Sequence, residues 1–253
     1  MKMHFLSGGR LRMRRSVFYP QAAKGETFEL SVVSTLLRHD QGNVLFDTGC
    51  SPEVATSPED RWGGLARLMV PIFPPAQTVI GQLPQTGLSP DDIDLVICSH
   101  LHPDHCGCNE HFKRATILCH AAEVTTAKAE GSEQQGYLAA DWDQPQGFKT
   151  FDAQYDVFGD GRIVLLPMPG HTPGMTAALV ALDRDGSFLL ASDAAAIEAN
   201  LVEGYAPKNS WDLEKATASL QEIRRIADNG ATVIFGHDAA QWDMLRTGAA
   251  HYE

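Results

Sequence analysis

Five apolar stretches of this chain each end on a histidine or an aspartate. They are NVLFD, LVICSH, RIVLLPMPGH, SFLLASD and TVIFGH, which end at Asp47, His100, His171, Asp193 and His237. Short apolar runs bounded by polar residues are typical of buried strands. In α/β folds, strand ends bring together side chains from distant parts of the sequence. The pattern therefore predicts sheets that carry a cluster of histidine and aspartate side chains along one edge.

The remaining segments predict further strands and helices. FELSVVSTLLRHD and NVLFDTG predict two strands joined by a hairpin turn at DQGN. Ser89 and Pro90 have the residue types that begin a helix, and a buried strand over 95–98 follows them. Helices are expected near 120–130 and 211–230. Strands mixed with crossing helices indicate a layered α/β fold with mixed sheets.

The C-terminal helix is expected to bury one apolar stripe, which Gly230 ends. The residues at helical spacing are Leu213, Ala216, Leu220, Ile223 and Ile226. No repeat, low-complexity tract or linker divides the chain. We therefore expect residues 1–253 to form a single domain.

Composition argues against several classes of partner. The net charge of −12 disfavours binding to nucleic acid, and the basic run RLRMRR is expected to be a solvated strand or hairpin. No apolar stretch is long enough to cross a membrane, and the N-terminus lacks the pattern of a signal peptide. The odd number of cysteines indicates reduced thiols in a cytoplasmic protein. We expect these to pack beside the cluster: Cys50, Cys98, Cys106, Cys108 and Cys119.

The stretch LVICSHLHPDHCGCN contains the densest group of potential metal ligands. His100 and His102 leave a strand at alternate positions, so they can converge on one ion. Asp104 and His105 in the following turn can face a second ion. Imidazole and carboxylate ligands suit zinc or another first-row divalent metal. His171 would complete the first site, His237 would complete the second, and Asp193 could bridge the two.

HLHPDH matches the H-x-H-x-D-H motif of the metallo-β-lactamase superfamily, and PGHTPG, SDA and FGHD follow in the order of its other ligands. The chain resembles that superfamily over nearly its whole length, beginning with LFDTG. The resemblance implies an αββα sandwich, an α/β fold with a dinuclear metal site at the edge of its two sheets. It implies one metal at His100, His102 and His171 and another at Asp104, His105 and His237, bridged by Asp193.

Several other polar residues are expected to have supporting roles. Asp47 is expected to orient a metal-bound group by a hydrogen bond rather than to bind metal itself. The remaining histidines lack the context of the motif and are expected to be structural or solvated: His4, His39, His111, His120 and His251.

Such a metal pair favours hydrolysis. Two Zn²⁺ ions about 3.5–4 Å apart can share a water and lower its pKa towards 7. The hydroxide would attack a carbonyl or phosphorus while a metal polarises the acceptor oxygen. Asp104 could orient the nucleophile, and Asp193 could either take a proton or hold the metals together. A redox di-iron site is not expected, because relatives of that kind have glutamate where this chain has His102.

The overall layout resembles the N-acyl homoserine lactonases. Classical metallo-β-lactamases lack the bridging aspartate, whereas this chain has Asp193. Glyoxalase II enzymes add a C-terminal helical domain, but only 16 residues follow His237 here. Nucleases of the RNase Z type have a basic exosite that the charge balance does not support. We therefore expect a small-molecule substrate, a lactone with an apolar chain.

Residues 50–87 are rich in apolar side chains and are interrupted by prolines. They predict either a flap over the site or a surface packed against the core or a homodimer partner. The apolar residues are Trp62, Leu65, Leu68, Met69, Val70, Ile72 and Phe73. Tyr137, Trp142 and Phe148 in a second irregular segment present the same two alternatives.

Two positions depart from the lactonase pattern. Ala196 stands where these enzymes carry a tyrosine that can donate to the lactone carbonyl, and Pro103 replaces a bulky apolar residue. Loss of one such donor can cost about 3 kcal/mol. The alternatives are therefore a thioester, phosphoester or organophosphate hydrolase on the same scaffold, or a catalytically weak metal-binding protein.

Overall fold

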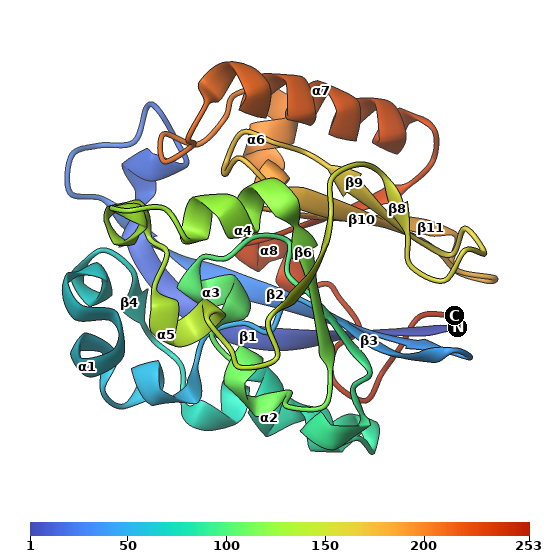
Figure 1. Cartoon of the computed structure of the whole chain (residues 1–253). Coiled ribbons are helices and arrows are strands. Elements are labelled where there is room, and N and C mark those ends of the chain that lie inside the picture. Colours follow the sequence, from blue (N-terminus) through green and yellow to red (C-terminus); the bar gives the residue numbers. More distant parts are fainter.

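Two β-sheets stacked face to face form the centre of the molecule. The computed structural model describes residues 1–253, and Figure 1 shows the sheets enclosed by helices. The strands of the first sheet are β1 (Lys2–Arg14), β2 (Thr27–His39), β3 (Gly42–Phe46), β4 (Val70–Pro71), β5 (Leu95–Ile97), β6 (Thr116–His120) and β7 (Phe148–Phe151). Those of the second sheet are β8 (Tyr155–Asp156), β9 (Ile163–Pro167), β10 (Thr176–Ala181), β11 (Ser187–Ser192) and β12 (Thr232–Phe235).

Both sheets are mixed, as expected. The first has the order β4-β1-β2-β3-β5-β6-β7, with antiparallel pairing among β4, β1, β2 and β3 and parallel pairing from β3 to β7. The hairpin between β2 and β3 forms at DQGN, as the sequence predicts. The second sheet, β12-β11-β10-β9-β8, is antiparallel except for the parallel pair β11 and β12.

Alternation of side chains along the strands builds three apolar layers. Neighbouring leucines of β2 point to opposite faces, so that Leu37 packs between the sheets and Leu36 packs under the helices of the first sheet. In β11, Leu190 likewise faces the other sheet, while Leu189 packs against α7 (Leu213–Asp228). Helices on both outer faces complete the αββα sandwich, which confirms the predicted fold class.

The helices are mostly short, and α7 is the longest of them. Figure 1 shows α7 lying across the outer side of the second sheet. The other α-helices are α1 (Pro58–Trp62), α2 (Val79–Gln82), α3 (Pro103–Cys106), α4 (Ala121–Ala127), α5 (Ala139–Trp142), α6 (Glu198–Glu203) and α8 (Ala239–Trp242). Short 3₁₀ helices include η3 (Gly63–Arg67), η6 (Pro90–Asp92), η8 (Ser132–Gln135) and η9 (Asp193–Ala195). The helix predicted after Ser89 is η6, with Ser89 in a capping box.

The buried stripe of α7 differs from the prediction at one residue. Asp212 caps the helix, and Ala216, Leu220, Ile223 and Ile226 are buried. Leu213 is 56% exposed, because it lies in the first turn before the helix reaches the sheet.

The remaining expectations about packing hold. All five cysteines are buried without disulfides. Residues 10–14 of RLRMRR lie in β1, where Leu11 is buried between exposed or half-buried arginines, and Arg15 begins η1 (Arg15–Val17). No helix of the structure combines the length and apolar character needed to span a membrane.

Candidate metal centre

The seven predicted ligands lie together where strands of both sheets end. His100 and His102 follow β5, Asp104 and His105 lie in α3, and His171 follows β9. Asp193 opens η9 directly after β11, and His237 follows β12. Six of these side chains are buried and His102 is half-buried. The structure thus brings together every residue that the sequence predicted for the site.

The ligand atoms form three overlapping groups, within each of which they lie no more than 4.8 Å apart. The groups are His100, His102 and His171; Asp104, His105 and His237; and His100, His105 and Asp193. We call the first group cluster A and the second group cluster B. The third group lies between them, in the position expected of a bridge.

The outward-facing ring nitrogens of three histidines point to hydrogen-bond acceptors. Nε2 of His102 donates to the carbonyl of Gln135 at 3.0 Å, and Nδ1 of His237 donates to the Ser31 carbonyl at 3.1 Å. Nδ1 of His105 lies 2.9 Å from Oδ2 of Asp47. These acceptors place the proton on the outward nitrogen, so the inward nitrogen of each ring has a free lone pair.

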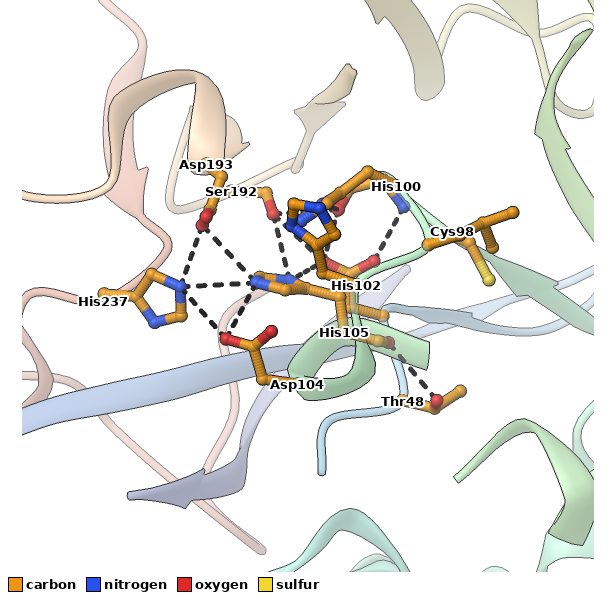
Figure 2. A network of polar contacts seen from close by, with 12 residues as sticks. Thr48, Cys98, His100, His102, Asp104, His105, Ser192, Asp193 and His237 are labelled. Carbon is orange, nitrogen blue, oxygen red and sulfur yellow. Dashed lines mark hydrogen bonds and ion pairs between the residues drawn. The ribbon is translucent and has the colours of Figure 1, made fainter. Parts of the chain in front are cut away.

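The inward nitrogens face one another in pairs. His171 Nε2 lies 3.0 Å from His102 Nδ1, and His105 Nε2 lies 3.3 Å from His237 Nε2. The buried Nε2 of His100 has no hydrogen-bond partner. Figure 2 shows the rings of His105 and His237 pointing toward the two aspartates. When His102, His105 and His237 are neutral and donate from their outward nitrogens, their inward nitrogens offer lone pairs that a divalent metal could bind.

Asp193 spans the two clusters with its two oxygens. Oδ1 lies 2.9 Å from Nε2 of His237 and 3.4 Å from Nε2 of His105, both in cluster B. Oδ2 lies 3.2 Å from Nε2 of His171 in cluster A. Asp104 contributes Oδ2 to cluster B, at 3.6 Å from each of the two histidine nitrogens. A carboxylate with one oxygen on each side has the geometry of a bridging ligand.

Burial and charge shift the pKa values of these groups in opposite directions. Burial, helped by the neighbouring histidines, lowers the pKa of His100 well below its usual value. Burial also lowers the pKa of His105, but Asp104 and Asp193 outweigh it and raise that pKa well above its usual value. Burial raises the pKa of Asp193, but the neighbouring histidines, His237 first, hold it well below its usual value. The buried carboxylates therefore require nearby positive charge, which protons or a metal can supply.

Asp47 contacts the centre through hydrogen bonds and is not a member of the three ligand groups, as expected. It accepts hydrogen bonds from the Ser99 backbone N–H at 2.7 Å, the Ser99 hydroxyl at 2.8 Å and the Ser192 hydroxyl at 3.1 Å, besides its contact with His105. Asp47 and Ser192 are also the two non-glycine residues with positive φ, at 59° and 46°. Such backbone strain persists only where surrounding contacts enforce it. The hydrogen-bond network thus fixes both strand ends.

A cavity of about 680 Å³ opens beside cluster A, where His102 and His171 form part of its wall. Three apolar side chains from the irregular segment also line this cavity, namely Leu65, Leu68 and Met69. Trp62, Ala66 and Phe73 of the same segment are buried in the core instead. Residues 50–87 therefore contribute some side chains to the cavity and others to the core, and whether the segment acts as a flap or contacts a homodimer partner stays a prediction.

The second irregular segment, around Tyr137 and Trp142, also contributes one side chain to the cavity and another to the core. Tyr137 lines the cavity and its ring lies 5.2 Å from that of His102, whereas Trp142 is buried in the core. Phe148 belongs to β7 and packs at the edge of the same core cluster.

Sequence reasoning missed several supporting residues. Ser99 and Ser192 each directly precede a predicted ligand in the sequence, and a hydroxyl at that position could have indicated a supporting role. Glu123 and the carbonyl of Gln135 also contact the ligand loops, but nothing in their sequence neighbourhood indicates it. The histidines expected to be structural lie outside the centre; His120, for example, caps α4 through its ring nitrogen.

An αββα sandwich with converging histidines and aspartates at the edge of its sheets defines a class of metal-dependent hydrolases. The chain belongs to the metallo-β-lactamase superfamily, whose family model matches residues 27–237. This confirms the resemblance seen in the motifs.

Named relatives share the whole length of the chain. The N-acyl homoserine lactonase AttM of Azorhizobium caulinodans is 30% identical, with 100% of this chain and 99% of the relative covered. AttM of Rhizobium radiobacter is 31% identical, with 100% and 98% covered. A structure of a Bacillus thuringiensis AiiA mutant with N-decanoyl-L-homoserine bound at the active site has a TM-score of 0.88 at 26% identity, covering 99% of this chain and 98% of that one.

Proposed function

We propose that this protein is a dinuclear metal-dependent lactonase that opens the ring of N-acyl homoserine lactones. The proposal rests mainly on one observation: His102 and His171 of the seven-residue centre line a cavity of about 680 Å³. The names of the full-length relatives support the same substrate class. A hydrolytic centre at the end of a partly apolar cavity suits a polar reacting group that carries an apolar chain.

The residues present fit a pair of metal ions. Cluster A would hold one ion, cluster B would hold the other, and Asp193 would bind both. Nitrogen and carboxylate ligands favour Zn²⁺, with other first-row divalent metals as substitutes. When bound, such a pair supplies an activated water at neutral pH and a Lewis acid for the lactone carbonyl.

The carboxylates of Asp104 and Asp193 would accept and transfer the proton of the attacking water. Asp104 and Asp193 are buried at the centre, 5% and 7% exposed, so they lie where that proton must be accepted. Opening the lactone breaks the bond between the acyl carbon and the ring oxygen, and the ring oxygen must gain a proton. We assign to Asp193 the transfer of that proton, because its two oxygens face both clusters.

The cavity would position the substrate's acyl chain. Leu65, Leu68 and Met69 line one side of it, and Trp211 contributes an aromatic surface. Burial of the chain there would stabilise the complex by about 0.8 kcal/mol for each methylene removed from water. The protein should therefore prefer lactones with longer acyl chains, up to the length of the cavity.

Ala196 does not take the part of the missing tyrosine. It is 1% exposed and packs in the apolar cluster around Phe18 and Val32, and it does not line the cavity. Its side chain donates no hydrogen bond to a substrate. This departure is the reason to include thioesters, phosphoesters and phosphotriesters among the compounds tested.

The test is hydrolysis of homoserine lactones with short, medium and long acyl chains by zinc-loaded protein, followed by proton release. We expect metal-dependent ring opening whose KM falls as the chain lengthens. His105→Ala should abolish turnover, whereas His111→Ala, which changes a half-buried histidine outside the centre, should retain it. Two bound metals with turnover on another ester class alone would replace the substrate assignment. Two bound metals without turnover on any ester would favour a metal-binding protein.

A further inference from the structure

Glu123 is a fully buried carboxyl group in the first turn of α4, and no part of the proposed chemistry uses it. Its Oε1 accepts the backbone N–H of Leu101 at 3.1 Å, and its Oε2 accepts that of Gly174 at 3.0 Å. Leu101 stands between His100 and His102 in the sequence, and Gly174 lies three residues after His171. One side chain therefore joins the two loops that carry all three ligands of cluster A.

The two loops pack closely around this carboxyl group. A Cβ atom on Gly174 would lie 2.4 Å from the backbone N and 2.5 Å from the Cβ of Glu123, so only glycine fits there. The loops also meet directly, since the Thr176 N–H donates to the Ser99 carbonyl at 2.9 Å. Glu123 therefore fills a space that leaves little freedom to either loop.

The segment that follows α4 provides a second contact to cluster A. The Gln135 carbonyl accepts from Nε2 of His102, and the Tyr137 ring lies against the His102 ring. Burial, and then the Glu123 carboxylate, raises the pKa of Tyr137, which keeps its phenol protonated. Residues 121–137 thus support cluster A from one side.

Cluster B depends on other parts of the chain. Its histidines are held by Asp47, which follows β3, and by the Ser31 carbonyl of β2. Neither contact involves residues 121–137. A change at Glu123 should therefore affect the two clusters unequally.

We propose that Glu123 is a positioning residue that sets the spacing of His100, His102 and His171 for metal binding in cluster A. The inference rests on the proposed function, because it takes cluster A to be a metal site. A carboxylate offers an acceptor to each N–H, whereas a glutamine of the same shape offers one acceptor and one donor group. In Glu123→Gln, the N–H of one loop would face a donor in a fully buried space, and that loop would move away.

The experiment compares metal binding by wild type, Glu123→Gln and Glu133→Gln, an exposed glutamate of η8 that serves as the matched control. Chelator competition would give the affinity of each of the two sites. We expect Glu123→Gln to weaken one site about 10–100-fold and to leave the other unchanged, the usual size of such an effect for residues that orient ligands. With cobalt(II), the absorption spectrum of the weakened site alone should change.

Turnover provides an independent measurement. Glu123 does not line the cavity, so Glu123→Gln should lower kcat and leave KM nearly unchanged. Glu123→Asp keeps both acceptors on a side chain one methylene shorter. If Glu123→Gln fails to fold, Glu123→Asp decides the question, and it should show the same unequal weakening to a smaller degree.

Two results would overturn the inference. One is wild-type affinity at both sites in folded Glu123→Gln; the other is equal weakening of both sites, which would mean a general loss of structure. A wild-type protein that binds no metal would contradict the proposed function itself, and this outcome is visible before any variant is made.

Discussion

Arg61 of α1 holds the irregular segment of residues 50–87 against the body of the protein. Its Nε lies 2.8 Å from Oδ1 of Asp141, and its terminal nitrogens contact Glu110 at 3.0 Å and Glu53 at 3.1 Å. The Asp141 side chain is fully buried, while those of Glu110 and Glu53 are 37% and 64% exposed. The contact with Asp141 should therefore dominate the energetic effect of losing Arg61.

The expected cost of Arg61→Met depends on pH. Burial raises the pKa of Asp141 to about 7, against the lowering effect of Arg61. In the unfolded chain this pKa is about 3.9. Folded Asp141 thus binds its proton more tightly than unfolded Asp141, and its contribution to stability decreases as pH rises from about 4 to about 7. Without Arg61 the folded pKa is higher still, so the decrease continues above pH 7.

The penalty of Arg61→Met should therefore be small near pH 5, where Asp141 is protonated in both proteins. At pH 8 it should reach about 3 kcal/mol, the lower end of the cost of leaving a buried charge unpaired, because protonation relieves part of it. For a chain of this size that corresponds to a fall in Tm of about 6–12 °C. KM for lactones should also rise, because Leu65 and Met69 in the same segment line the cavity.

Chemical denaturation of the metal-free protein at pH 5 and pH 8 would measure the effect. Arg61→Met with Asp141→Asn should recover most of the stability at pH 8, since the double variant no longer buries a charge. Arg67→Met is the matched control, because Arg67 makes only an exposed contact with Glu59. An equal loss at both pH values, or no recovery in the double variant, would refute the reasoning.

Three further predictions concern the metal centre and its surroundings. Asp47→Asn should reduce metal affinity and turnover about 10–100-fold, because the single oxygen of asparagine cannot accept from both the Ser99 N–H and Nδ1 of His105. Chelator competition and lactone assays would measure both quantities, and an unchanged metal affinity would contradict the prediction. Ala196→Tyr should destabilise the protein by about 1–3 kcal/mol without raising turnover, because residue 196 is buried away from the cavity; a gain in kcat at unchanged Tm would contradict it. Removal of metal by a chelator should abolish hydrolysis and lower Tm, and Zn²⁺ should restore both; hydrolysis that survives chelation would contradict it.

The ligand set could be predicted from the sequence because each ligand follows a strand. Strands have a recognisable pattern, and strands that run in the same direction end at the same edge of a sheet, so the apolar run before His237 already indicated where that residue would lie. The buried stripe of α7 was predictable for the same reason, since helical periodicity marks the face that packs. The prediction that Leu213 is buried was wrong, because periodicity does not show where along a helix the contact with the sheet begins.

The supporting contacts could not be predicted in this way. Glu123 lies 22 residues from Leu101 and 51 from Gly174, and neither pair shares a local pattern. The acceptor for His102 is a backbone carbonyl, which every residue possesses, so residue type carries no signal there. In residues 50–87, some side chains pack in the core and others line the cavity. Which of the two a side chain does depends on its surroundings in the fold rather than on the composition of the segment.

The two clusters also differ in how they relate to the substrate. Cluster B is supported by β2 and by the residue after β3, elements in the interior of the first sheet that do not reach the cavity. Cluster A is supported by residues 121–137, and four of these, Gln134, Gln135, Gly136 and Tyr137, line the cavity. The segment that orients His102 is therefore the one that would contact the acyl chain. Substitutions among these four lining residues should alter chain-length preference and the metal affinity of cluster A together, whereas substitutions among Leu65, Leu68 and Met69 should alter chain-length preference alone.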